Sequence, residues 1–141
     1  MLFSTHGALA ADPSLSSFVL SQVNLDPTTD GYVTASEWER YSLRSELVVL
    51  SACDTGVGKA AAGGGLMGLP FAQVAAGNQN ALVTLWPVAD AATAECMTRF
   101  FKRLTEGQAQ ARALAAVKRE FIDHPPYSHP RFWAGFVLCG V

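Results

Sequence analysis

The 141-residue chain is predicted to fold as an α/β domain, with a mainly parallel sheet flanked by helices. Four short apolar runs predict the strands, and the three after the first are almost continuously apolar. Strands of that kind are typical of sheets covered on both faces. Segments with helical patterning separate the later runs, an arrangement that favours parallel neighbours.

The predicted strands are "LFST" (2–5), "LVVLSA" (47–52), "ALVTLW" (81–86) and "GFVLCG" (135–140). Between the first two, the weaker runs "FVLSQV" (18–23) and "GYVT" (31–34) predict a small excursion from the main sheet. No internal repeat and no linker divides the sequence. We therefore predict a single domain over residues 1–141.

The clearest helix is predicted to start at Asp90, a good N-cap residue, and to end at Gly107. A second helix follows as "QARALAAVKREFI" (110–122), and "LMGLPFAQVAAG" (66–77) predicts a third, with Pro70 near its first turn. The apolar residues of the first two helices fall on one stripe each and are predicted to be core. These stripes are Met97, Phe100, Phe101 and Leu104, and Ala113, Leu114, Val117 and Phe121.

Composition excludes several functional classes. The net charge of −2 gives no basic field that would recruit nucleic acid or an anionic membrane, and no run approaches the roughly 18 apolar residues of a membrane-spanning helix. "ALAADP" (8–13) is similar to a signal-peptidase site, but the residues before it lack a basic region and an apolar region, so we do not expect a secretory signal. The three cysteines form no metal-type CxxC pair, which favours free thiols in a reducing, cytoplasmic location and no metal site.

Two chemically useful side chains follow predicted strands directly. Cys53 ends "LVVLSAC" and is followed by the polar turn "DTG", whereas Cys139 lies within an apolar strand and is predicted to be inert. His6 follows the first strand in the same way. If these two strands are parallel neighbours, their carboxyl ends bring the histidine and the cysteine within reach, as activation of a thiol nucleophile requires.

The motifs together resemble a known family. A strand followed by His-Gly, then "LVVLSACDTG", "GLMGLP", "LVTLWPVADAATAECMTRFFKRL" and "HPRFWAGFVLCG", is similar to the C-terminal part of a CHAT domain. This caspase-like module often occurs beside tetratricopeptide repeats. The resemblance covers essentially the whole chain, with five motifs in the family's order.

The resemblance implies a caspase-like sheet and a cysteine endopeptidase. Cys53 would be the nucleophile and His6 the general base and acid. The backbone N–H groups of Gly7 and Cys53 would form the oxyanion hole. Such a mechanism needs no metal and no organic cofactor. The partner of such an enzyme is a protein or peptide substrate. Asp54 and Asp90 are nearby carboxylates that would favour a basic residue on the amino side of the scissile bond.

Several departures from the family leave a second function open, that of a CHAT-fold interaction module with little or no turnover. The family's GEG motif, its arginine-containing helix motif and its paired aspartates are altered at Gly63–Gly65, at Phe71 and Gln73, and at Ala89 and Asp90. Related sheets also have two strands before the histidine strand. We therefore expect a partial domain, or one completed by a tetratricopeptide-repeat protein or another partner that supplies those strands.

Two weaker patterns suggest other ligands. "DPTTDGYVTASE" (26–37) fits an EF-hand loop, but "TASE" is also a capping box in which Thr34 caps a helix and Glu37 reaches back. We favour a turn and a capped helix over calcium binding. "TGVGKA" (55–60) resembles a phosphate-binding loop but lacks two residues of that motif.

Overall fold

The computed structural model describes residues 1–8, 10–23, 25–52 and 68–140, and Cys53 and Asp54 lie outside these ranges. The chain divides into two compact units. The first comprises Met1–Pro87 with Val137–Val141, and the second comprises Val88–Phe136.

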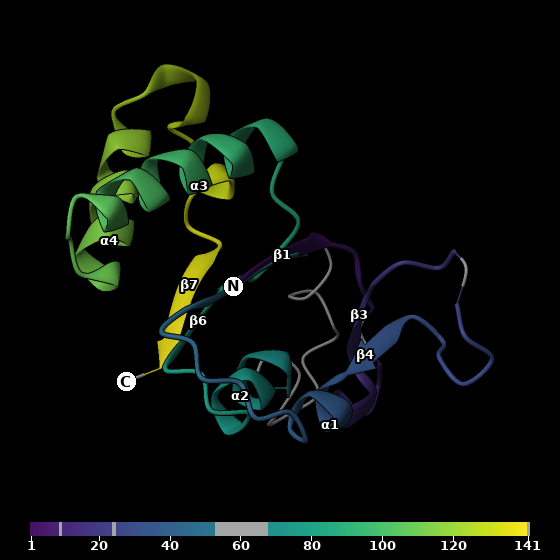
Figure 1. Cartoon of the computed structure of the whole chain (residues 1–141). Helices are drawn as coiled ribbons and strands as arrows, with labels where there is room; N and C mark the ends of the chain where they lie inside the picture. Colours follow the sequence, from purple (N-terminus) through teal and green to yellow (C-terminus); the bar gives the residue numbers. More distant parts are fainter. Residues whose placement is uncertain (9, 24, 53–67, 141) are drawn as a thin grey trace. The chain divides into compact units, whose positions relative to one another are not determined.

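The main sheet contains β1 (Leu2–Thr5), β5 (Val48–Ala52), β6 (Asn80–Thr84) and β7 (Phe136–Gly140), in the order β1-β5-β6-β7. The first three strands are parallel, with Phe3 opposite Leu50 and Leu50 opposite Val83. Gly140 at the end of β7 lies beside Asn80 at the start of β6, so these two strands run in opposite directions. The predicted mainly parallel α/β sheet is confirmed (Figure 1).

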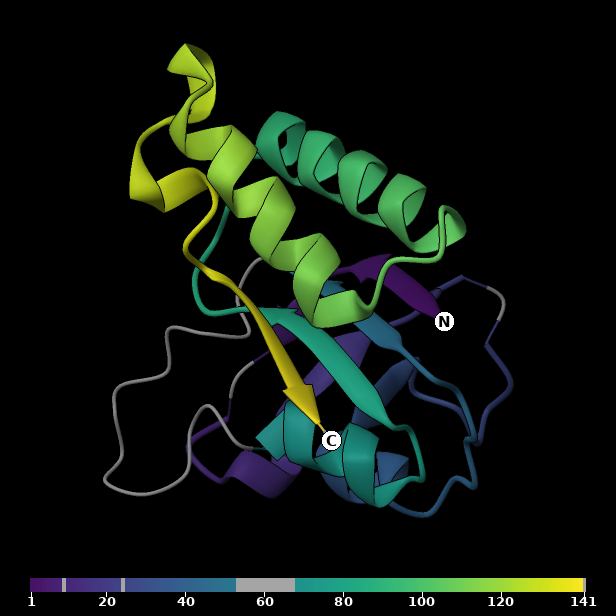
Figure 2. The same ribbon diagram turned by 90° about the vertical axis from the view of Figure 1, so that its left-hand side faces the viewer.

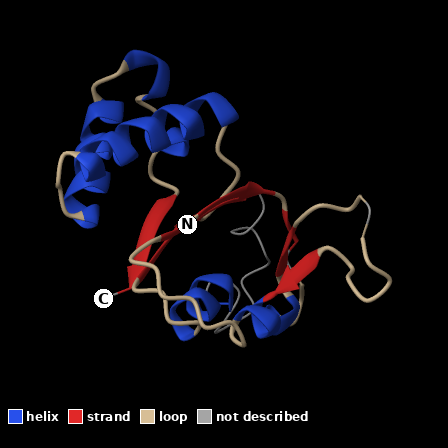
Figure 3. Ribbon diagram, viewed as in Figure 1, coloured by secondary structure: helices blue, strands red, loops and turns tan. Residues whose placement is uncertain are grey.

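A second, smaller sheet forms the predicted excursion. It consists of β2 (Gly7–Ala8), β3 (Ser17–Val19) and β4 (Tyr32–Thr34), paired antiparallel in that order. A short 3₁₀ turn, Pro13–Leu15, lies between β2 and β3. The strands of both sheets stand out in red in Figure 3. The sequence had not predicted β2, which is only two residues long.

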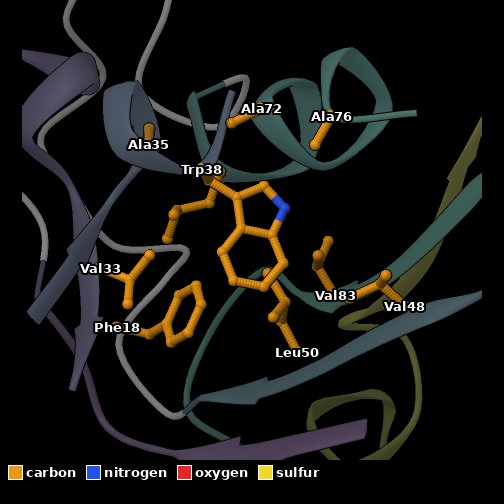
Figure 4. Packing of buried hydrophobic residues seen from close by; sticks show 10 residues of the cluster. Phe18, Val33, Ala35, Trp38, Val48, Leu50, Ala72, Ala76 and Val83 are labelled. Carbon is orange, nitrogen blue, oxygen red and sulfur yellow. The ribbon is translucent and has the colours of Figure 1, made fainter. Parts of the chain in front are cut away.

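One face of the main sheet packs against α1 (Ala35–Trp38), α2 (Gly68–Ala75) and the small sheet. Trp38 lies at the centre of this core, beside Phe18, with its ring close to both helices and strands (Figure 4). The ring centroids of Phe3, Phe18 and Trp38 are 4.9 to 5.4 Å apart in edge-on or tilted pairs, a favourable aromatic geometry. The small sheet is therefore fixed to the main sheet by an aromatic core.

The C-terminus of α2 is tied to the segment before β5. Gly77 has a φ of +99°, a conformation that favours glycine, and its N–H donates to the Val74 carbonyl while that of Asn78 donates to the Gln73 carbonyl. The Leu43 N–H donates to the Ala76 carbonyl at 2.7 Å. These bonds fix where the chain enters β5.

The second unit is a helical hairpin of α3 (Asp90–Thr105) and α4 (Gln110–Ile122), followed by the 3₁₀ turns Pro125–Tyr127 and Pro130–Phe132 (Figure 2). The hairpin buries the whole predicted stripe of α4, and Met97 and Phe100 of α3, whereas Phe101 and Leu104 are half-buried. Glu120 joins the helices by ion pairs to Arg99 and Arg103.

The first helix of this hairpin begins at Asp90, as predicted, but the N-cap role given to Asp90 was wrong. Ala89 occupies the N-cap position, where its carbonyl accepts from the Thr93 N–H, and Asp90 is the first residue of the helix. An acidic residue in the first turn still favours the helix through its dipole. No helix of the described residues is long and apolar enough to cross a membrane.

Candidate active site at the ends of two parallel strands

His6 lies at the point where the chain leaves the main sheet and enters the small one. It follows β1 directly, precedes β2, and its side chain is exposed. Thr5 stands opposite Ala52 in the parallel pairing of β1 with β5. His6 and Cys53 are the residues that come next in the chain after these two partners. The neighbouring strands assumed in the sequence analysis are therefore present, and they are in matching register.

Val19 of β3 bonds two successive residues at this junction, the side chain of Thr5 and the main chain of His6. Its N–H donates to the His6 carbonyl at 2.8 Å, and its carbonyl accepts a hydrogen bond from the Thr5 hydroxyl. A strand residue presents its N–H and C=O to the same side, so both bonds join the same edge of β3. This attachment restricts the main chain that carries the imidazole. The sequence analysis missed the roles of Thr5 and Val19, since short pairings of this kind leave no periodic pattern.

The Gly7 amide is directed away from β3. Gly7 stands opposite Phe18, and the bond from the Val19 N–H to the His6 carbonyl makes this a non-hydrogen-bonded pair of the antiparallel ladder. β2 is also the end strand of its sheet. The geometry thus leaves the Gly7 N–H outside the β2–β3 ladder, on the residue next to the histidine.

The remaining predicted site residues are not brought together by the described geometry. Cys53 and Asp54 lie outside the described residues. Asp90 is exposed on the first turn of α3, within the second unit. Gln73, one of the positions that departs from the family pattern, is fully buried on α2.

Of the other two cysteines, Cys96 is a poor nucleophile, and the position of Cys139 indicates no function. Cys96 is completely buried in α3, and this burial raises the pKa of its thiol to about 12, despite the opposing effect of Lys118 and Arg99. It stays protonated at neutral pH. Cys139 is half-buried in β7, less enclosed than predicted. Both thiols are free.

The segment with the EF-hand pattern forms the turn and capped helix that we favoured. The Thr34 hydroxyl accepts from the Glu37 N–H, while the Glu37 carboxylate accepts from the Thr34 N–H at 2.9 Å, which is a complete capping box. The Asp26 carboxylate accepts from Thr28, and this bonding lowers the pKa of Asp26. The carboxylates of Asp26, Asp30 and Glu37 in this segment thus accept hydrogen bonds within local turns and the cap. Among the described ranges, no group of three acidic, histidine or cysteine residues is arranged for a metal ion.

The strands β1 and β5 are parallel neighbours, and a small antiparallel sheet is formed by the chain between them, so the main sheet and its helices make an α/β fold. The family profile of the CHAT domain matches residues 1–141. The chain belongs to the CHAT domain family, as the resemblance of its motifs had predicted.

Two relatives are similar over most of this chain. Tetratricopeptide repeat protein 28 of Mus musculus is 35% identical over 114 residues, and its Homo sapiens counterpart is 34% identical over 114 residues. In both cases the match covers 81% of this chain but only 5% of the relative. The chain therefore corresponds to a small part of each relative.

Proposed function

We propose that this domain is a cysteine endopeptidase in which His6 and Cys53 act as a catalytic dyad. The observation that carries the proposal is the register of β1 with β5, which sets Thr5 opposite Ala52, one residue before each member of the dyad. Two side chains that follow neighbouring parallel strands at the same level emerge at one edge of the sheet. Membership of a caspase-like family supports the same pairing.

In the proposed reaction, the Cys53 sulfur attacks the carbonyl carbon of a peptide bond, and His6 accepts the thiol proton. The tetrahedral intermediate collapses to a thioester as His6 donates that proton to the leaving amine. A water molecule then hydrolyses the thioester, with His6 again accepting a proton, and regenerates the thiol. The exposed position of His6 fits a group that must meet both substrate and water.

The proposed oxyanion hole uses the backbone N–H groups of Gly7 and Cys53. The outward direction of the Gly7 amide, inferred from the β2–β3 ladder, supports the first of these donors. A donor held in place by a sheet stabilises a developing negative charge without having to reorganise. Asp54 and Asp90 remain our candidates for recognising a basic residue on the amino side of the scissile bond.

The test compares wild type with Cys53→Ala and His6→Ala, using a cysteine-directed acyloxymethyl ketone and a peptide library. We expect the wild type to be labelled at Cys53 and to cleave peptides, and both variants to lose cleavage. Cys96→Ala is the control variant, because its buried thiol should contribute nothing to either signal. Equal labelling of wild type and Cys53→Ala, with no cleavage by either, would show that the domain is not a peptidase.

That negative result would favour the second function, an interaction module that keeps the fold without turnover. Both relatives are named for tetratricopeptide repeats. We propose that the domain works together with such repeats, which would select its substrates or partners in either case. We also place it in the cytoplasm, because a catalytic thiol must stay reduced.

A further inference from the structure

We propose that the hollow formed by the segment between β3 and β4, by β4 and by α1 in the first unit docks a segment of a partner protein that carries both basic and apolar side chains. This surface, which we call the β4 groove, is lined by residues 20–21, 25, 27–33, 37 and 41. The proposal goes beyond the proposed peptidase activity and does not depend on Cys53.

Four large apolar side chains gather in the β4 groove. Leu20, Leu25, Tyr32 and Tyr41 come from different parts of the segment, and each is between 36% and 52% exposed. Isolated exposed apolar residues are ordinary on a protein surface, but a group of them in one hollow is typical of a docking site. The base of the β4 groove is packed against the core of the unit. Val33 is buried in the aromatic core, and the ring of Tyr41 packs against that of Trp38 with 5.9 Å between the centroids.

The two charged residues that line the β4 groove are both acidic. They are Asp30 and Glu37, and no lysine, arginine or histidine lines it among the described residues. The two compact units also differ in the sign of their charged residues, with acidic residues in excess in the first and basic residues in excess in the second. A partner segment with lysine or arginine complements this surface.

The edge of β4 excludes a different way of binding, in which a partner adds a strand. The bonds from the Leu20 N–H to the Gly31 carbonyl and from the Ala35 N–H to the Ser16 carbonyl turn the N–H groups of Tyr32 and Thr34 outward. The Asp30 carboxylate accepts from the first, and the Glu37 carboxylate accepts from the second, each at 2.9 Å.

These carboxylates therefore occupy the donors that a new strand would need, a known way of protecting a sheet edge. The β4 groove presents oxygen acceptors, negative charge and apolar surface. Recognition must come from side chains of the partner, namely cationic groups that reach the two carboxylates and apolar groups that cover the leucines and tyrosines.

The test uses a short fluorescein-labelled peptide in which leucine and arginine alternate, with a leucine–glutamate peptide of the same length for comparison. Binding to the whole chain is followed by fluorescence anisotropy. We expect the arginine peptide to bind, the glutamate peptide not to bind, and the affinity to fall as salt is added.

The variants separate charge from apolar contact. Asp30→Asn with Glu37→Gln keeps acceptor oxygens for both backbone N–H groups but removes the charges, and should weaken binding at least about fivefold. Leu25→Ser should weaken it by a similar factor. Asp12→Asn and Leu15→Ser are the matched controls, because Asp12 also caps a local turn and Leu15 is also exposed, but neither lines the β4 groove. Circular dichroism and thermal midpoints check that every variant is folded.

No binding of the arginine peptide by the folded wild type, or equal binding by the charge-free variant, would overturn the proposal. The proposal would also be overturned if Leu25→Ser changed only the sedimentation of the protein, through loss of a dimer. The occupant of the β4 groove would then be a second copy of this chain. The same peptide should bind Cys53→Ala with unchanged affinity, so this result and the peptidase test can fail independently.

Discussion

At the scale of single residues, Val19 connects the small sheet to the candidate site. This strand residue accepts a hydrogen bond from the Thr5 side-chain hydroxyl through its carbonyl and donates to the main-chain carbonyl of His6 through its N–H. A catalytic group whose position is fixed to within fractions of an ångström reacts faster than one that moves freely. Thr5 is therefore a positioning residue in our account.

Thr5→Val removes the hydroxyl and keeps the β-branched shape. We expect it to lower the free energy of unfolding by about 1 kcal/mol, because the Val19 carbonyl loses a partner. We also expect slower labelling of Cys53, with recovery in Thr5→Ser. Urea unfolding and the labelling rate measure the two effects.

The control is Thr98→Val, which removes a hydroxyl that bonds the Ala94 carbonyl within its own helix. It should leave the labelling rate unchanged. A Thr5→Val protein that labels as fast as wild type would remove the positioning role, whatever its stability.

Cys96 predicts a pH dependence of stability. Burial raises the pKa of its thiol from the ordinary value of 9.0 to about 12 in the folded protein. Below pH 9 the thiol is neutral in both states, and above it the unfolded chain loses the proton first, so stability falls between about pH 9 and 12. Burial lowers the pKa of the nearby Lys118, an effect of opposite sign that both proteins in the comparison retain.

Cys96→Ala should remove the part of this loss of stability that is due to ionisation of the thiol. We expect the stability difference between wild type and variant to shrink with rising pH, by up to about 1.4 kcal/mol per pH unit. Denaturant unfolding at pH 8 to 11 measures it. A difference that stays constant over this range would show that the thiol is not shielded from ionisation.

At the scale of elements, two helices end at a glycine in the same C-terminal capping motif, but the space around the two glycines differs. Gly77 after α2 and Gly107 after α3 both have positive φ, at 99° and 85°, and the residue after each donates back into its helix. A Cβ on Gly77 would lie 2.6 Å from the Leu43 carbonyl oxygen, whereas a Cβ on Gly107 would meet nothing within 4 Å.

This pair separates backbone strain from steric clash. Gly107→Ala should cost about 1 kcal/mol of folding free energy, the usual penalty for the left-handed conformation. Gly77→Ala should cost at least about 1 kcal/mol more, because the backbone before β5 must move. Thermal or urea unfolding of both variants tests this, and equal losses would contradict the close approach of Leu43.

Helices and strands could be predicted wherever burial or capping leaves a long pattern in the sequence. Both helices of the second unit, the four main strands and the capping box at Thr34 all follow from local sequence. The two-residue β2 did not, because its pairing with β3 depends on contacts far apart in the chain. β6 was predicted to reach Trp86 but ends at Thr84, before Pro87, which has no N–H to continue a ladder.

At the scale of the whole molecule, the sequence predicted a mainly parallel sheet and suggested that the strands before His6 and Cys53 are neighbours, but not what fixes the site at their ends. The small sheet is held to the main sheet by Phe3, Phe18 and Trp38. Its strand β3 supplies Val19 to the His6 junction and is followed directly by Leu20, which lines the β4 groove. Such contacts depend on three-dimensional packing, which residue spacing does not encode. The excursion of residues 7–34 thus connects the proposed catalytic histidine to the proposed docking surface.

The most direct test of the central claim, that His6 and Cys53 form one catalytic pair, is the rate at which iodoacetamide alkylates Cys53 at pH 7 in wild type and in His6→Ala. A histidine beside a cysteine increases the reactive thiolate. We predict alkylation at least about tenfold slower in His6→Ala, with the Cys139 rate unchanged as an internal control. Equal Cys53 rates in the two folded proteins would contradict the pairing.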